Sequence, residues 1–181
     1  ERGLEPLADA MTELDTPSIE KKAVEFIVTE ADTEELLVPT AEAALEGAKD
    51  ILAERVAQDS SNRSDIRGFY MRTGLIKVKG VGDADKAKTS VYQMYWDYDE
   101  PLNEIKAHRV LAINRGEREG VLEVTIDVDV DGAVDVLKHK YITYNKYHNE
   151  AIEDGLVRLL SPAVVREIRS DLGDNADTHG I

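Results

Sequence analysis

The sequence contains no cysteine and no long apolar run, and each absence excludes a class of protein. Without cysteine there are no disulfides, no thiolate zinc sites and no cysteine nucleophile. No apolar stretch approaches the roughly 20 residues that a membrane-spanning helix needs, and no signal peptide opens the sequence. We therefore expect a cytoplasmic protein. Because the chain starts with Glu1 and not with methionine, we also expect a piece of a longer protein.

Positive charge is scarce as well. The chain has 22 Lys and Arg residues against 37 Asp and Glu residues, which gives a formal net charge of −15. Nucleic-acid affinity comes largely from basic side chains that displace counterions, and a chain this acidic repels phosphate at long range. We therefore expect weak or no nucleic-acid binding by this chain alone, unless its basic residues gather on one face.

The remaining composition is that of a globular protein. Hydrophobic residues make up 42% of the 181 residues and aromatic residues only 6%, so Leu, Ile, Val and Ala supply most of the core. Such a core favours packed helices. The length suits one domain or a compact core with a helical appendage. We predict a mainly α fold, α+β at the margin, over residues 1–181, with possible sub-units 1–74 and 75–181.

Apolar residues recur at helical spacing through much of the chain. The clearest helix is predicted over 41–58, where Thr40 is placed to cap its first turn. Thr16 is the expected cap of an earlier helix. Further helices are predicted over 4–14, from Thr16 onwards, from Ser60 to Gly74, over 104–115, and in three segments after Val134, the last restarted by Ser161 and Pro162.

Two segments carry strand patterns. Residues 75–81 predict a short strand that ends in glycines, and residues 121–130 alternate strictly between apolar and mainly acidic side chains. If these strands pair, they form a small antiparallel unit. Helices must then cover its apolar face, because a lone two-stranded ribbon is marginally stable in water. Residues 84–96 fit either a helix or a strand, and we prefer a helix.

No motif for phosphate or metal chemistry is complete. The glycines after the first predicted strand lack the spacing of a Rossmann loop and no Gly-Lys-Ser/Thr follows them. Asp127, Asp129 and Asp131 are spaced like calcium ligands, but Lys138 stands where a calcium loop needs its last carboxylate. The strand pattern also assigns these aspartates to a solvated face. We expect no metal site and no cofactor.

The histidines do not show the spacing of a zinc-binding helix. We interpret His108 as a structural or capping residue. A Ser-His-Asp site built from distant residues stays open, although no Gly-x-Ser-x-Gly elbow supports one. We expect no enzymatic activity. The four histidines are His108, His139, His148 and His179.

Basic residues form two clusters in the sequence. The second cluster is interleaved with tyrosines, and positive charge beside aromatic rings is typical of single-stranded nucleic-acid binding. The alternative is an ordinary solvated face with Tyr141 and Tyr144 in the core. The candidate nucleic-acid contacts are Arg109, Arg115 and Arg118 in the first cluster, and Lys138 and Lys140 in the second.

Several stretches, taken together and in order, resemble the Tex family of bacterial transcription accessory proteins. They span nearly the whole chain, and their specificity lies in the ordered set. The stretches are 1–8 (ERGLEPLA), 44–55 (ALEGAKDILAER), 97–102 (DYDEPL), 108–117 (HRVLAINRGE), 158–162 (RLLSP) and 166–169 (REIR).

The resemblance implies a cytoplasmic factor linked to transcription and related to a eukaryotic elongation factor that binds histones and polymerase. Members have a helical N-terminal part with a helix-turn-helix-like element, then an RNase H-like domain without the expected catalytic acids, helix-hairpin-helix motifs and a C-terminal OB-type RNA-binding domain. Nucleic-acid binding is attributed chiefly to that last domain. The resemblance places this chain before the RNase H-like domain.

From this we expect a non-catalytic architectural region of a transcription factor whose full-length protein binds RNA or DNA through other domains. The alternative is an acidic protein-interaction module that docks RNA polymerase or a ribosomal component.

Overall fold

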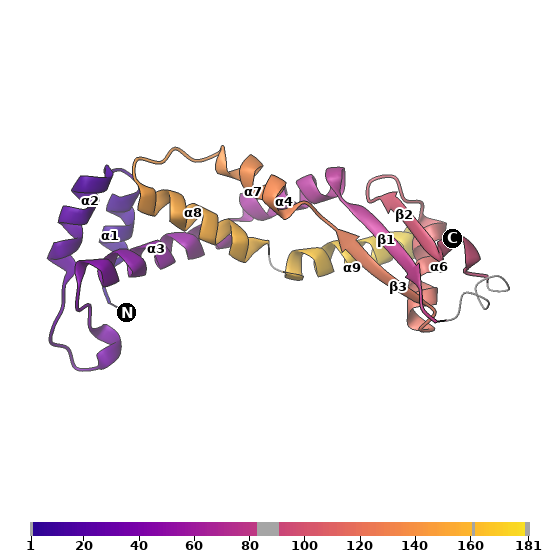
Figure 1. The fold of residues 1–181 in the computed structure, drawn as a ribbon, viewed down its shortest axis with the longest axis horizontal. Coiled ribbons are helices and arrows are strands. Elements are labelled where there is room, and N and C mark those ends of the chain that lie inside the picture. Colours follow the sequence, from indigo (N-terminus) through magenta and orange to yellow (C-terminus); the bar gives the residue numbers. More distant parts are fainter. Residues whose placement is uncertain (1, 83–90, 161, 180–181) are drawn as a thin grey trace. The chain divides into compact units, whose positions relative to one another are not determined.

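The computed structural model describes residues 2–82, 91–160 and 162–179. The fold is mainly helical with one small three-stranded antiparallel sheet (Figure 1), which confirms the predicted fold class. No helix in the described ranges is long and apolar enough to cross a bilayer.

The chain divides into two compact units, and each unit is built from two stretches of sequence. Unit 1 comprises residues 1–63 and 134–160, and unit 2 comprises residues 64–133 and 161–181. This division is discontinuous, unlike the possible sub-units 1–74 and 75–181 considered from the sequence.

Unit 1 is helical. Its long helix α3 packs along α8 and against α1 and α2. It also holds the start of α4 and the end of α7. Its elements are α1 (Glu5–Met11), α2 (Thr16–Ala23), the 3-10 helices η1 (Val24–Phe26) and η2 (Glu34–Leu36), α3 (Ala41–Gln58), α4 (Ser60–Thr73, in part), α7 (Val130–Lys138, in part) and α8 (Lys146–Leu159).

Side-chain caps set several of these helix starts. The Thr40 hydroxyl accepts a hydrogen bond from the Ala43 amide at 3.1 Å, which confirms the predicted cap and bounds of α3. The expected cap at Thr16 is wrong. Asp15 caps α2 by accepting from the Ser18 amide at 2.9 Å, so Thr16 is already helical.

The core of unit 1 combines large side chains from the N-terminal helices with small ones where the long helices meet. Leu7, Met11 and Ile19 are fully buried. On α3 the buried positions include Ala44 and Ala48, and on α8 they include Ala151. Small residues allow α3 and α8 to approach closely, and this close approach positions the polar contacts described below.

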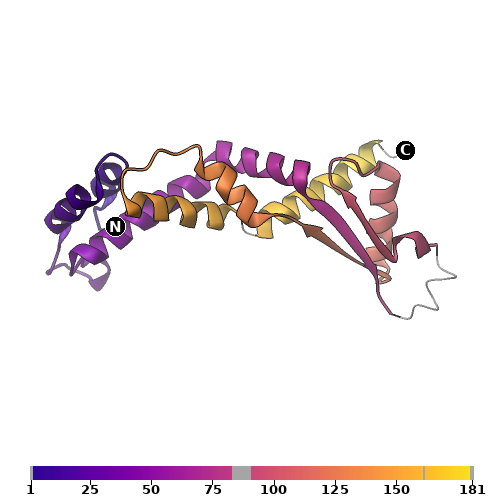
Figure 2. The same ribbon diagram turned by 45° about the horizontal axis from the view of Figure 1, so that its top comes forward.

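Unit 2 is built around the sheet, whose strand order is β2-β1-β3 with all pairs antiparallel. Helix α6 packs on β3 and on α9; Figure 2 shows the same elements from another angle. The elements are the rest of α4, β1 (Leu75–Gly80), η3 (Gln93–Tyr95), β2 (Asp97–Pro101), α6 (Ala107–Arg118), β3 (Leu122–Asp127), the start of α7 and α9 (Pro162–His179).

The two predicted strands do pair, and their pairing is antiparallel, as expected for that case. Ile76 of β1 lies opposite Ile126 of β3, and Val78 lies opposite Val124. Ile76 and Val78 are buried, whereas the alternating lysines of β1 are exposed. The sheet therefore has one apolar face and one charged face. Strand β2, which the sequence did not predict, completes the sheet.

The predicted strand over 121–130 is too long. Strand β3 ends at Asp127, and α7 begins at Val130. The physical reason is Asp129, whose carboxylate accepts a hydrogen bond from the Gly132 amide at 3.0 Å and so caps the helix. The helix predicted over 84–96 lies largely outside the described residues, and its described end contains the short helix η3.

Candidate functional site

The five predicted nucleic-acid contacts divide between the two units. Arg109, Arg115 and Arg118 lie on α6 in unit 2, whereas Lys138 and Lys140 lie in unit 1 at the end of α7. Each cluster thus lies within one unit, and the contacts of each side chain show how much of its charge is engaged within the fold.

Arg109 holds α6 to the neighbouring strand β2. Its guanidinium lies over the Tyr98 ring, 5.6 Å from the ring centroid, and Nη1 is 3.2 Å from the Tyr98 hydroxyl. That hydroxyl in turn donates to Glu100. Burial, together with the hydrogen bond to Glu100, raises the pKa of Tyr98 to about 12. Arg109 is therefore engaged in packing.

Arg115 and Arg118 occupy the exposed last turn of α6. Arg115 Nε is 3.2 Å from Glu119 Oε1, although the Arg115 side chain remains 72% exposed. The Tyr92 hydroxyl also donates to Glu119, and hydrogen bonds from Tyr92 and Arg115 lower the pKa of that carboxyl. Arg118 lines a depression of about 270 Å³ with acidic neighbours that include Glu117. These two arginines stay accessible, but within an acidic setting.

Lys138 and Lys140 both make contacts within unit 1. Lys138 Nζ lies 2.5 Å from Glu153 Oε1 on α8. Lys140 Nζ donates to Asn62 Oδ1 at 2.8 Å. The buried Asn62 amide donates in turn to the Tyr141 hydroxyl at 2.6 Å. The second cluster is therefore largely part of the packing between helices.

The tyrosines of the second cluster differ from one another. Tyr141 is half-buried and hydrogen-bonded, in keeping with the alternative reading of core tyrosines. The expected burial of Tyr144 is wrong, because this side chain is 58% exposed in the segment that precedes α8. Helical spacing failed there because α8 begins only at Lys146.

The aspartates that resembled calcium ligands have other roles. Asp127 forms an ion pair with Lys77 at 3.1 Å, and Asp129 caps α7. Asp131 lies in the first turn of α7 and not on a strand face. In the ranges that the structure covers, no group of three or more His, Asp or Glu side chains is arranged to hold a metal ion.

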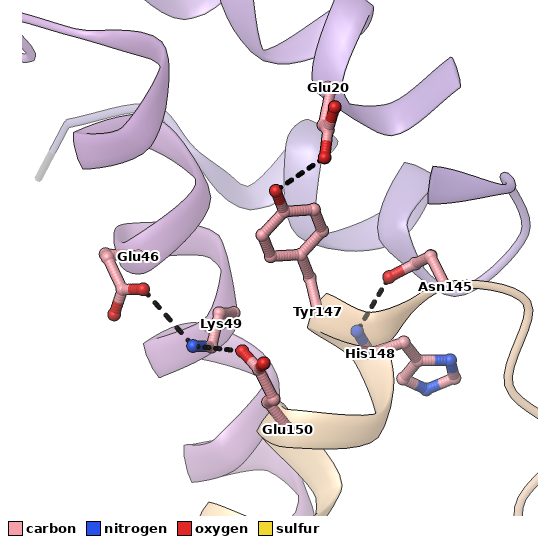
Figure 3. Close-up of polar contacts among 7 residues, drawn as sticks. All are labelled: Glu20, Glu46, Lys49, Asn145, Tyr147, His148 and Glu150. Carbon is pink, nitrogen blue, oxygen red and sulfur yellow. Dashed lines mark hydrogen bonds and ion pairs between the residues drawn. The ribbon is translucent and has the colours of Figure 1, made fainter. Parts of the chain in front are cut away.

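A polar network that the sequence did not reveal joins α2, α3 and α8 in unit 1 (Figure 3). Lys49 on α3 lies between Glu46, at 3.2 Å, and Glu150 on α8, at 2.7 Å. Burial by itself lowers the pKa of Lys49, but the hydrogen bonds to Glu150 and Glu46 outweigh it and raise that pKa. The pair of Lys49 with Glu46 follows the local i,i+3 spacing of a helix, whereas the pair of Lys49 with Glu150 joins distant residues, so no local pattern predicts the link from α3 to α8.

Further polar contacts lie at the start of α8. The Tyr147 hydroxyl donates to Glu20 on α2 at 2.8 Å. Burial, with this hydrogen bond, raises the pKa of Tyr147 to about 12. Asn145 caps α8 by accepting from the His148 amide at 2.7 Å. An Asn three residues before a buried helical residue is a capping signal that could have been recognised in the sequence.

His148 is a buried side chain of unit 1 whose surroundings disfavour its protonated form. The side chain is 7% exposed, its Nδ1 has no hydrogen-bond partner in the described structure, and burial lowers its pKa. It also lies in the first turn of α8, where the helix dipole disfavours a cation. Below the unfolded pKa of about 6.5, the unfolded chain therefore binds a proton that the folded chain does not.

We expect unfolding free energy to fall as the pH is lowered from about 7 to about 5, with part of this loss due to His148. Urea denaturation across this range, compared with His148→Gln, measures that part as the difference in slope. Equal slopes for the two proteins would show that His148 does not contribute.

The sequence of this chain is similar to a family model and to several known proteins. Residues 15–179 match the model of the family described as Tex central region-like. The uncharacterized protein YdcI of Bacillus subtilis is 37% identical over 186 residues, covering 99% of this chain and 25% of YdcI. Protein tex of Bordetella pertussis is 38% identical over 133 residues, covering 72% of this chain and 16% of that protein.

A more distant relative is the transcription elongation factor SPT6 homolog of Arabidopsis thaliana. It is 25% identical over 150 residues, which cover 74% of this chain and 9% of that protein. The chain thus spans a quarter or less of the length of these relatives.

Proposed function

Because this chain belongs to the Tex central region-like family, we propose that it is a non-catalytic architectural region of a cytoplasmic transcription accessory factor. The full-length protein binds RNA or DNA chiefly through other domains. Relatives named protein tex and transcription elongation factor SPT6 homolog support the transcriptional context.

One structural observation carries the architectural role. The charged side chains that the sequence offered for phosphate binding are largely engaged in contacts between elements of the fold. Arg109 stacks on Tyr98, Lys138 pairs with Glu153, and Lys140 binds Asn62. If these three side chains bound phosphate instead, their contacts within the fold would be lost. Arg115 and Arg118 remain as auxiliary contacts, and acidic neighbours weaken their attraction for phosphate.

We expect the isolated chain to bind short single-stranded RNA and duplex DNA with dissociation constants no tighter than about 10⁻⁴ M at physiological salt, because few cations are free to displace counterions. Fluorescence anisotropy titration measures this. Arg115→Gln with Arg118→Gln should abolish any residual binding, and Lys138→Gln with Lys140→Gln, which removes the same charge from the other cluster, serves as the matched control. Nanomolar affinity for either nucleic acid would contradict the proposal.

The second candidate function is an acidic module that docks a basic protein of the transcription or translation machinery. The net charge of −15 favours it. Salt-sensitive retention of purified RNA polymerase or ribosomal subunits by the immobilised chain would support this function over a purely internal role.

A further inference from the structure

Strand β3 leaves one edge of the sheet in unit 2 open. In the order β2-β1-β3, no strand lies beyond β3 among the described residues (Figure 1). An open edge offers a row of backbone amides and carbonyls to another strand. Proteins usually protect such edges, so what surrounds β3 decides whether this edge is available.

The register shows which backbone groups point outwards. The Val81 amide donates to the Val121 carbonyl at 2.8 Å, and Lys79 lies opposite Glu123. Hydrogen-bonded pairs alternate along an antiparallel ladder. Odd-numbered residues of β3 therefore bond to β1, and Val124 and Ile126 direct their amides and carbonyls to the open edge. No hydrogen bond from outside the sheet to these groups occurs in the described chain.

A groove of about 590 Å³ runs along this edge. Three consecutive residues, Val124 to Ile126, line it from β3, so the groove lies beside this outer strand. Val165 and the arginines of α9 line the other side. The Arg169 guanidinium donates through Nη2 to Asn114 at 2.5 Å and to Glu117 at 3.1 Å, and its buried Nη1 has no hydrogen-bond partner in the described structure. The Arg169 stem adds apolar surface to the groove.

The charged face of the sheet indicates which kind of strand can bind beside β3. On this face Lys79 of β1 lies between Asp97 of β2 and Glu123 of β3, so charges of opposite sign alternate across the strands. The exposed carboxylate of Glu123 is the last of these charges, at the open edge. Opposite charges directly across from one another stabilise a sheet, and like charges destabilise it. The next position in this row therefore favours a basic side chain.

We propose that the open edge of β3 binds an extended segment of a partner protein as a fourth strand. The segment is apolar on the side that faces α9 and basic on the other side. Its backbone pairs with Val124 and Ile126, its apolar side chains enter the groove, and its basic side chain lies beside Glu123. This inference goes beyond the proposed architectural role and does not depend on nucleic-acid binding.

A second copy of this chain is less favoured at this edge than a basic segment, because its charge is strongly negative. Pairing Val124 with Val124 would set Glu123 opposite Thr125, but pairing Val124 with Ile126 would set Glu123 opposite Asp127, which is repulsive. The net charge of −15 adds to this repulsion. Charge complementarity therefore favours a partner with basic residues over a homodimer.

The test uses the 181-residue chain and a short capped peptide of alternating lysine and valine. We expect the peptide to bind and to slow hydrogen exchange at the Val124 and Ile126 amides. The same peptide with backbone N-methyl groups on the bonding residues has equal charge. It should bind roughly tenfold more weakly or worse, because each lost backbone hydrogen bond is worth about one such factor. If both peptides bound equally well, binding would depend on charge attraction and not on backbone hydrogen bonds, and the proposal would be overturned.

Two variants separate strand addition from a folding defect. Val124→Pro removes an amide that points to the edge and not to β1, so it should abolish peptide binding. Glu123→Lys should reverse the preference, so that a glutamate-valine peptide binds more tightly than the lysine-valine peptide. Unchanged preference in Glu123→Lys, or concentration-dependent dimerisation through β3 in sedimentation, would refute a basic partner strand even if Val124→Pro fails to fold.

Discussion

Replacing Asn145 by alanine is expected to lower the free energy of unfolding by about 3 kcal/mol. The Asn145 side chain is 6% exposed and makes three hydrogen bonds in unit 1. Its Oδ1 caps α8 at the His148 amide (Figure 3), and its Nδ2 donates to the carbonyls of Met11 and Leu14, each at 2.7 Å. Alanine removes the cap and leaves both carbonyls without this donor.

Two further variants separate the stability that Asn145 contributes as a helix cap from the stability that it contributes through its bonds to Met11 and Leu14. Asn145→Asp keeps an acceptor for the cap but places a carboxylate against two carbonyls, so it should remain strongly destabilised. Thr40→Ala removes only an exposed cap and should cost about 1 kcal/mol. Urea denaturation followed by circular dichroism gives all three values. If Asn145→Asp were as stable as the parent chain, the contacts to Met11 and Leu14 would contribute nothing.

Replacing Gly155 by alanine is expected to destabilise unit 1 by about 2 kcal/mol, through overpacking where α8 meets α3. A Cβ at Gly155 would lie 2.5 Å from the Ala53 carbonyl oxygen and 2.7 Å from the Val56 Cβ. Neither neighbour is the end of a flexible side chain, so the two helices must separate. Separation weakens the buried contacts along the whole α3–α8 interface.

The same substitution at Gly173 is the matched control. A Cβ at Gly173 would contact only the side-chain nitrogen Nδ2 of Asn114, at 3.5 Å, which is an ordinary van der Waals distance. Alanine is the better helix former by up to about 1 kcal/mol, so Gly173→Ala should stabilise the chain. The two variants are thus expected to differ in sign. A stabilised Gly155→Ala protein would contradict the close approach of the helices.

Local signals explain why much of the helical structure could be predicted from the sequence. The bounds of α3 follow from Thr40 as a cap and from apolar residues at helical spacing, both of which act within a few residues. Strand β1 was likewise predicted from a short pattern of apolar residues that ends in glycine. At Asp129 two local signals compete. The alternation of apolar and acidic residues continues past the end of β3, but the Asp129 carboxylate caps α7 and so ends the extended segment.

Strand β2 shows the limit of local reasoning. Asp97–Pro101 is short, acidic and closed by proline, which opposes a strand assignment. It forms a strand because β1 supplies its partners, among them Lys77 opposite Asp99 and Lys79 opposite Asp97. Tertiary pairing outweighs intrinsic preference here, and single-sequence reasoning has no access to it.

The candidate site was also predictable only in part. The sequence showed which basic residues cluster, but it did not show which of them are bound by other side chains of the fold. Lys138 pairs with Glu153, and Lys140 binds Asn62, 78 positions away. The contacts of Asn145 reach Met11, 134 positions away. Such pairs depend on which segments meet in space, so their roles emerge only from the fold.

The discontinuous make-up of the two units has a consequence for synthesis on the ribosome. Helix α3 emerges long before α8, which covers its apolar face and ends only at Leu159. Unit 2 likewise awaits α9, which begins at Pro162. Closing such long loops delays native contacts. Neither unit is therefore complete until nearly all of this stretch has been translated, and the early helices must stay unaggregated until then, which the excess of negative charge favours.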